Sequence, residues 1–259
     1  MIKIYDNLNL RNFWSKYWQN VSEECDFIVN YEYYPFNLLK NYLKKDHLIL
    51  EAGCGTGRVL KGLHNEGYRI IGFDYDIGAL RIMNKVNQYS LFLGDIMNMP
   101  LKKETFDTVL CFGVVTCIEE IEAINKSLKE INFVLKSDGI LIISLLNYNL
   151  SRRLHRLLGA VRGILGGRHF HCWADSLGNL EIFLSKEFKI IERAPSISRQ
   201  PYYEMLSFFR SSEQIDRKLA RVSDTEYKLN YFGESVFNIS KKLFPYAISG
   251  STTFVCSKR

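Results

Sequence analysis

The chain has 259 residues, a formal net charge of +6 and a hydrophobic content of 47%. This length suits one α/β domain with insertions, or a core domain with a smaller lobe. The positive charge permits contact with an anionic surface but is too mild to indicate nucleic-acid or membrane binding. The six cysteines form no C-x-x-C pair and the longest apolar run, residues 140–146, is far shorter than a membrane span, so we expect a cytoplasmic protein.

The first 46 residues are rich in aromatic side chains at helical spacing. Phe13, Trp14, Tyr17 and Trp18 recur at i, i+1, i+4 and i+5. A stripe of this kind usually packs against a core. We therefore expect a helical segment over residues 1–46.

Residues 48–58 predict a strand, a tight turn and the start of a helix. The apolar run 48–50 stops at an acid, Glu51, and glycines follow at 53, 55 and 57. Glycine lets the backbone take unusual φ values and lets a ligand approach without a Cβ in the way. Neither the G-x-G-x-x-G fingerprint nor the phosphate loop G-x-x-x-x-G-K-[ST] fits here, so a nucleotide bound through phosphate is not indicated.

The rest of the chain alternates strand and helix, a pattern typical of a parallel sheet covered on both faces. The expected strands are 48–50, 69–73, 91–96, 106–113, 140–146, 188–194 and 251–256, and the expected helices are 57–66, 76–87, 119–135 and 175–187. Residues 137–139 are expected to form a turn. Asp74 follows the second strand about twenty residues after the first, where Rossmann-like units place a carboxylate on the ribose hydroxyls.

The pattern E-x-G-x-G-x-G at residues 51–57, followed by strand-end acids at Asp74 and Asp95, resembles the class I S-adenosylmethionine-dependent methyltransferases over residues 48–147. The resemblance implies an α/β fold with a doubly wound, seven-stranded, mostly parallel sheet whose last strand is antiparallel, with helices on both faces. It also implies an N-terminal helical lid (1–46), a Rossmann-like core (47–195), a helical cap insertion (196–248) and a final core strand (249–259).

The resemblance further implies S-adenosylmethionine as cofactor and S-adenosylhomocysteine as product. In that family the glycine loop meets the amino-acid end and the ribose, an acid in the position of Asp95 accepts from the adenine amino group, and the apolar residue after it, here Ile96, packs on the ring. The expected cofactor-binding residues are Glu51, Gly53, Cys54, Gly55, Arg58, Asp74, Tyr75, Asp95, Ile96, Phe112 and Gly113. No metal site is expected.

A general base is harder to assign. Many small-molecule members of the family carry His in the position of Cys117, so one candidate base is missing. His169 and His171 follow the fifth core strand, and an imidazole titrates close enough to neutral pH to deprotonate an acceptor. The alternative reading is that both are ordinary loop histidines.

Residues 151–168 are basic, with leucines and a valine on one helical stripe and Arg152, Arg153 and Arg156 off it. Three interpretations stay open: packing on the core, contact with the inner membrane surface or a lipid substrate, and nucleic-acid binding. The leading functional hypothesis is methyl transfer to a small molecule such as a sugar, lipid-linked or quinone-like acceptor. RNA or protein methylation and an inactive binding module are the alternatives, and the sequence indicates no oligomeric state.

Overall fold

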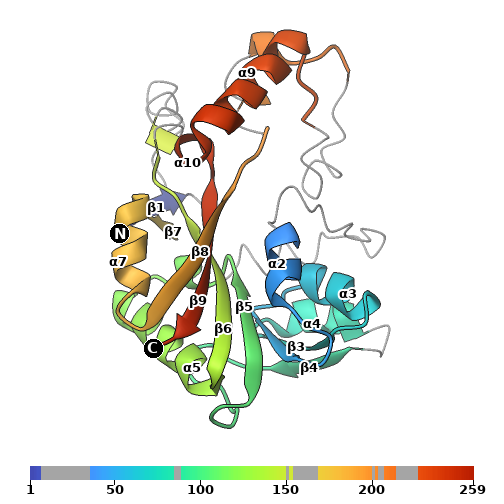
Figure 1. Ribbon diagram of the computed structural model, residues 1–259, viewed down its shortest axis with the longest axis vertical. Coiled ribbons are helices and arrows are strands. Elements are labelled where there is room, and N and C mark those ends of the chain that lie inside the picture. Colours follow the sequence, from blue (N-terminus) through green and yellow to red (C-terminus); the bar gives the residue numbers. More distant parts are fainter. Residues whose placement is uncertain are drawn as a thin grey trace.

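The computed structural model describes residues 1–6, 36–84, 89–149, 152–153, 169–199, 202–203, 207–213 and 227–259. Seven strands form the main sheet in the order β4-β3-β2-β5-β6-β9-β8 (Figure 1). Their bounds are β2 Leu48–Ala52, β3 Arg69–Asp74, β4 Ser90–Leu93, β5 Phe106–Phe112, β6 Leu135–Leu146, β8 Phe188–Ser196 and β9 Ser251–Lys258. β9 runs antiparallel to both of its neighbours, and the pairs from β4 to β6 are parallel. The predicted doubly wound sheet with a final antiparallel strand is confirmed.

Helices cover both faces of this sheet. α2 (Phe36–Tyr42), α3 (Arg58–Asn65) and α4 (Ile77–Asn84) contribute to one apolar cluster, and α5 (Ile121–Val134) and α7 (Leu177–Leu184) contribute to the other. The strands supply both clusters alternately: in β5, Val109 and Cys111 face the α5 side while Leu110 faces the α3 side. Burial on both faces explains why the parallel strands read as continuous apolar runs.

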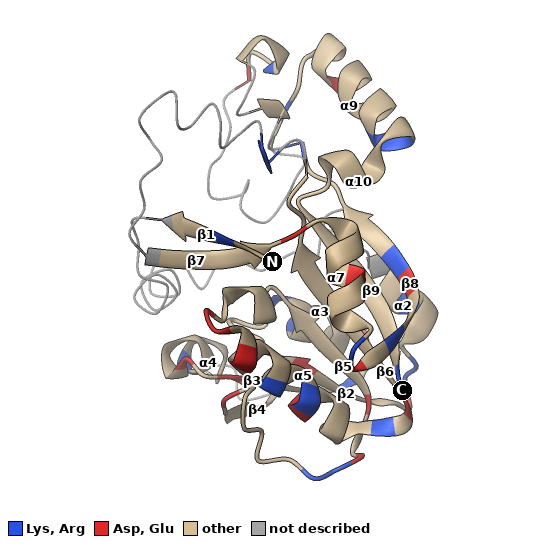
Figure 2. Cartoon of the chain, turned by 90° about the vertical axis from the view of Figure 1, so that its left-hand side faces the viewer, with Lys and Arg blue, Asp and Glu red and all other residues tan. Residues whose placement is uncertain are grey.

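The N-terminal segment begins with a strand, so the prediction of a helix there is wrong for the first residues. β1 (Ile2–Asp6) pairs antiparallel with β7 (His169–Ala174), and the two lie side by side as a separate small sheet (Figure 2). The prediction fails because the partner of this strand lies far away in the sequence, and such pairings are decided by tertiary context. α2 is the described helical part of the segment, and the aromatic stripe at Phe13–Trp18 lies outside the described residues.

A second difference concerns the predicted turn at 137–139. These residues lie inside the bounds of β6, where the register with β5 shifts between the pairs Phe106–Leu135 and Thr108–Ile140. The extra residues on β6 are accommodated as an irregularity of the ladder rather than as a separate turn. The strand predicted from residue 140 is confirmed beyond that point.

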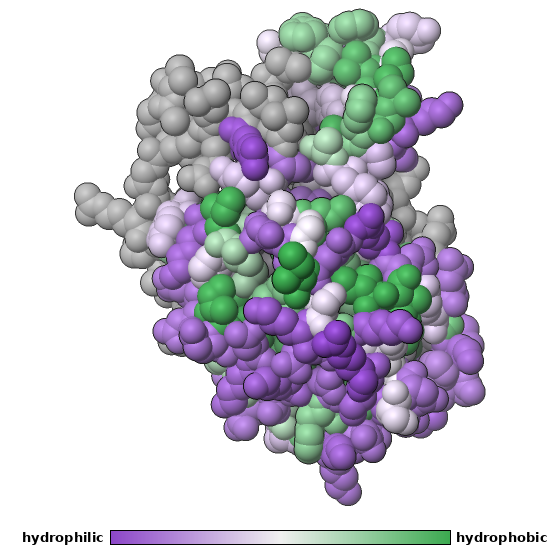
Figure 3. Space-filling view, turned by 60° about the vertical axis from the view of Figure 1, so that its left-hand side comes forward, coloured by the Kyte–Doolittle hydropathy of each residue, from purple (hydrophilic) through white to green (hydrophobic). Residues whose placement is uncertain are grey.

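The part of residues 196–248 that the structure describes includes η2 (Ser207–Phe209), α9 (Tyr231–Leu243) and α10 (Pro245–Ile248). α9 stands beyond the ends of β8 and β9, away from α3 and α4 (Figure 1). Phe209, Leu229 and Phe237 form its own small core. Hydrophobic side chains also gather on its outer surface (Figure 3), among them Tyr231, Phe232, Ile239 and Leu243.

The basic stretch 151–168 lies outside the described residues except for Arg152 and Arg153, so its predicted amphipathic helix stays a prediction. In the described part of the chain, no helix is both long and apolar enough to cross a membrane.

Candidate active site

The candidate site lies where the strand order reverses. β2 is hydrogen-bonded to β3 on one side and to β5 on the other, so the chain leaves neighbouring strands in opposite directions at this point. In open α/β sheets, ligands bind in the crevice at the carboxyl ends of the strands beside such a reversal. The glycine loop follows β2 and Gly113 follows β5, which brings both predicted regions to this edge.

The glycine loop needs its glycines for both conformation and space. Gly53, Gly55 and Gly57 have φ values of 72°, 52° and 77°. A Cβ on Gly53 would lie 2.3 Å from Val114 Cγ2, and one on Gly57 would lie 2.0 Å from Met83 Cε. The backbone of the loop is thus held close to neighbouring side chains, and it has positive φ values that residues other than Gly rarely adopt.

Glu51 is a buried acid with an unsatisfied oxygen. The residue is 4% exposed and its Oε2 atom has no hydrogen-bond partner. Burial and, to a smaller extent, the charge of Asp74 raise the pKa of this carboxyl to about 8, although a hydrogen bond from the Leu60 backbone opposes the shift. No described Lys, Arg or His forms an ion pair with Glu51, so the charged carboxylate lacks a counter-charge from this part of the chain.

Asp74 has a structural role that the sequence did not predict. Its two carboxylate oxygens accept from the Gly55 N–H at 2.7 Å and from the Asp76 N–H at 2.9 Å. Burial raises the pKa of Asp74, while these backbone donors oppose the shift. The carboxylate therefore fixes the glycine loop, and the predicted ribose contact would use its remaining lone pairs.

Asp76 is a structural residue of the site that the sequence reading missed. It caps α4 by accepting from the Gly78 and Ala79 N–H groups at 2.8 and 3.1 Å. An Asp directly before an apolar helix is the signal that would have identified it. This cap also holds the segment that leads from Asp74 into the helix.

The residues predicted to meet the adenine are partly open to solvent. Asp74 and Leu93 are paired in register, so Tyr75 and Asp95 follow neighbouring strand ends. Tyr75 is 56% exposed, and Asp95 is also exposed and accepts from the Met97 N–H at 2.9 Å. Ile96, in contrast, is 7% exposed and packs in the α5-side core, which leaves little of its surface for a ring.

The other predicted cofactor residues divide between backbone and side-chain roles. Cys54 is buried in the α3-side core, where burial raises the pKa of its thiol, so only its backbone is available to a ligand. Arg58 is the first residue of α3 and is half-exposed. Phe112 is half-buried at the end of β5, and Gly113, with φ 72°, donates to Ser144 Oγ at 3.1 Å. A Cβ on Gly113 would meet nothing within 4 Å.

Comparisons with known proteins agree with this geometry. A family model described as a methyltransferase domain matches residues 50–143. An uncharacterized protein of Methanocaldococcus jannaschii is 25% identical over 136 residues, which cover 51% of this chain and 51% of that protein. The ubiquinone/menaquinone biosynthesis C-methyltransferase of Campylobacter jejuni is 26% identical over 198 residues, which cover 69% of this chain and 81% of that protein.

One solved structure shares the fold over nearly the whole chain. It is the 1,6-didemethyltoxoflavin-N1-methyltransferase of Burkholderia thailandensis with bound 1,6-didemethyltoxoflavin and S-adenosylhomocysteine. Its TM-score is 0.58 at 14% identity, and the alignment covers 96% of this chain and 86% of that chain. Residues 50–143 therefore match a methyltransferase-domain family, and the solved structures share the fold of this chain. The chain spans about half the length of several curated relatives that it matches.

The segment after β5 is held by β7. η1 (Val115–Cys117) follows Gly113, and the Cys117 thiol donates to the Gly113 carbonyl at 3.2 Å. Trp173 of β7 donates its Nε1–H to the carbonyls of Ile118 at 2.9 Å and Glu119 at 3.1 Å. Burial raises the pKa of Cys117 to about 12, so the thiol stays protonated and does not replace the missing histidine as a base.

The two candidate histidines lie on a strand, not on a loop as the alternative reading supposed. His169 and His171 are two residues apart in β7, and His169 pairs with Asp6 of β1. The register of β7 with β1 shifts between the pairs Phe170–Tyr5 and Cys172–Ile4, so His171 lies at a β-bulge. His171 is half-buried, and the side chain of His169 lies outside what the structure describes. Their catalytic role stays a prediction.

Proposed function

We propose that this protein transfers a methyl group from S-adenosylmethionine to a small-molecule acceptor. The observation that carries the proposal is the unpartnered Oε2 of Glu51 beside the glycine loop. A buried carboxylate without a counter-charge favours a cationic ligand, and the amino-acid end of S-adenosylmethionine carries an ammonium group. The glycine residues next to it carry no side chains, so their backbone groups can meet that end of the cofactor directly.

The residues present fit the cofactor along its length. Glu51 and the glycine loop would hold the amino-acid end, Asp74 the ribose, and Asp95 the adenine amino group. The cofactor supplies a methyl group already activated by the positive charge of its sulfur. The protein's own contribution is therefore to orient the acceptor in line with that sulfur and to exclude water. A base is needed only where the acceptor is protonated at its reacting atom.

A small molecule is the favoured acceptor class. The Campylobacter jejuni relative, whose name assigns it to ubiquinone and menaquinone biosynthesis, matches beyond the family domain, over 69% of this chain. This relative supports the quinone-like ring among the three acceptor candidates, the others being a sugar and a lipid-linked molecule. The net charge of +6 is what favours RNA or protein as the alternative, and it is a weaker support.

The cofactor half of the proposal is tested through the pH dependence of binding. Titration calorimetry with S-adenosylhomocysteine should show affinity rising with pH between about pH 6 and pH 7.5, by up to about tenfold per unit. The reason is that the bound ammonium requires ionised Glu51, whose pKa without the ligand is about 8. Glu51→Gln, which has nearly the same shape, should bind more weakly and with no such pH dependence. Wild-type protein that fails to bind the ligand at all would leave only the inactive binding module.

The same variant gives a second readout without ligand. The folded state keeps the Glu51 proton up to about pH 8, while the unfolded state releases it near 4.5, so the free energy of unfolding should fall as pH rises between these values. Glu51→Gln should remove this fall.

The acceptor class is tested with S-adenosylmethionine labelled in its methyl group. The protein is incubated with a small-molecule extract, with total RNA and with a protein fraction, and the label is followed. Label in the small-molecule fraction supports the proposal, and label that needs RNA or protein contradicts it.

A further inference from the structure

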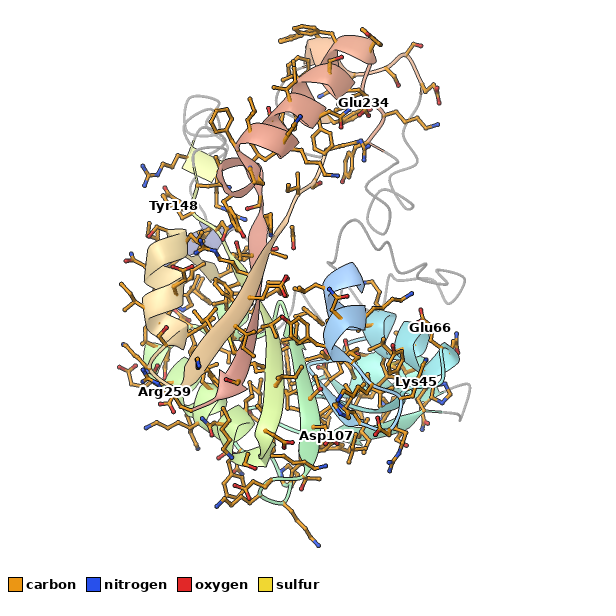
Figure 4. The ribbon with its side chains drawn as sticks, in the orientation of Figure 1. Lys45, Glu66, Asp107, Tyr148, Glu234 and Arg259 are labelled. Carbon is orange, nitrogen blue, oxygen red and sulfur yellow. The ribbon has the colours of Figure 1, made fainter. Side chains whose placement is uncertain are left out.

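Arg152 lies just after β6, on backbone that is fixed at several points. Its N–H donates to Asn149 Oδ1 at 3.0 Å, and Asn149 Nδ2 donates to the carbonyls of Ser249 and, at 3.4 Å, Tyr246. Tyr148, one residue before Asn149, marks this end of β6 (Figure 4). The turn that carries Arg152 is thus tied to the segment between α10 and β9.

The guanidinium of Arg152 is half-buried, and among the described residues its hydrogen-bond partner is the Gly250 carbonyl. Its Nη2 donates to the Gly250 carbonyl at 3.2 Å, and no carboxylate of the described residues lies within ion-pair distance of it. Two other arginines differ, because Arg193 pairs with Glu181 and Arg199 pairs with Glu234. Burial lowers the pKa of Arg152, because desolvation disfavours the charged form. Residues 150–168 contain five arginines and no acid, so this stretch of sequence supplies no counter-charge.

A short chain of contacts connects the turn that carries Arg152 to the end of β5. The N–H of Tyr148 donates to the carbonyl of Asp175, the residue after β7, at 2.7 Å. Trp173 of β7 donates to the carbonyls of Ile118 and Glu119 after η1. Cys117 in turn donates to the carbonyl of Gly113. The turn that carries Arg152 therefore follows β6, the neighbour of β5, on the η1 and β7 side of the site, and not on the Asp74 and Asp95 side where the ribose and adenine are expected.

We propose that Arg152 binds a carboxylate or phosphate group of the acceptor. A guanidinium has five N–H donors in a planar fork that matches these anions, and Gly250 occupies one of them. An anionic group would supply the counter-charge that the described residues lack, and it would orient the acceptor relative to the methyl group. This inference rests on the proposed methyl transfer and narrows its acceptor to an anionic molecule.

The experiment uses inorganic phosphate and benzoate as probes. Each is titrated at constant ionic strength, with chloride as the balancing anion, into protein saturated with S-adenosylhomocysteine, and binding is followed by calorimetry. We expect wild-type protein to bind at least one probe, and Arg152→Gln to bind it at least about tenfold more weakly. The probe that binds separates a phosphate from a carboxylate acceptor.

Arg153→Gln is the matched control. Arg153 is the adjacent arginine, is exposed and places its guanidinium 5.5 Å from the ring centre of Tyr148. The control should bind the probe within about twofold of wild type, because an exposed surface charge contributes little. Arg152→Lys, which keeps the charge but loses the fork, should recover part of the binding and guards against a failure of Arg152→Gln to fold.

Three results would overturn the inference. The first is equal probe binding by wild type and Arg152→Gln, and the second is no probe binding by wild type. The third is loss of S-adenosylhomocysteine affinity in Arg152→Gln, because this would show that the guanidinium binds the carboxylate of the cofactor. Failure of the proposed function is distinguishable, since wild-type protein would then not bind S-adenosylhomocysteine at the outset.

Discussion

The two sides of the candidate site are built in different ways. On the cofactor side, each functional group follows directly from a strand of the main sheet: Glu51 and the glycine loop from β2, Asp74 from β3 and Gly113 from β5. We call the η1 and β7 side, where we place the acceptor, the acceptor side. There the groups are brought together by segments far apart in the chain, as in the pairing of β1 with β7. The first side depends on local strand and helix geometry, and the second depends on long-range pairing.

The buried polar groups differ in the same sense. The cofactor side buries two carboxylates, one of which is satisfied by backbone N–H groups and one of which keeps a free oxygen. The acceptor side buries a neutral amide, Asn147, which donates to Ser249 Oγ at 2.6 Å and accepts from Thr252 Oγ1 at 3.0 Å. A satisfied neutral network holds structure, whereas an unsatisfied buried acid indicates a ligand.

The largest expected effect tests this contrast directly. Asp74→Ala leaves the N–H groups of Gly55 and Asp76 without acceptors and should lower the free energy of unfolding by about 2–4 kcal/mol. It should also weaken S-adenosylhomocysteine binding by at least about tenfold, because the loop loses its anchor. Urea denaturation and calorimetry measure the two quantities.

Asn147→Ala is the matched control from the acceptor side. It removes a buried side chain with two hydrogen-bond partners and should cost a similar amount of stability, about 1–3 kcal/mol. Its S-adenosylhomocysteine affinity should stay within about twofold of wild type. If both variants lose affinity equally, the two sides of the site are not separable as described.

The sequence predicted the strands and the glycine loop of the cofactor side well because their signals are local. The strands from β2 to β5, the glycine loop and the acids at strand ends can each be read from a few consecutive residues. The second role of Asp74, as the anchor of Gly55, could not be read in this way because it depends on the positions of two strand ends in space. Strand β1 was missed for the same reason, since five residues indicate a strand only when their partner is known.

A smaller effect, the difference in stability between two glycine variants, separates crowding from backbone strain. Gly53→Ala combines a positive φ with a Cβ placed 2.3 Å from Val114, and should cost about 2–4 kcal/mol. Gly67→Ala has a similar φ of 82° but meets nothing within 4 Å, so it should cost only about 1–2 kcal/mol. Urea denaturation of the pair gives the difference, and equal costs would show that the loop relaxes away from Val114.

The smallest effect concerns how the acceptor side is attached to the rest of the molecule. Trp173→Phe keeps an aromatic ring beside Lys3 and Phe170 but loses the N–H that donates to the Ile118 and Glu119 carbonyls. One shared hydrogen bond is worth about 0.5–1.5 kcal/mol, so urea denaturation should show a loss in that range. Cofactor affinity should not change, because the contact lies on the η1 side of Gly113. Amide hydrogen exchange should become faster in η1 and in the residues directly after it. Faster exchange in the glycine loop instead would show that β7 supports both sides of the site.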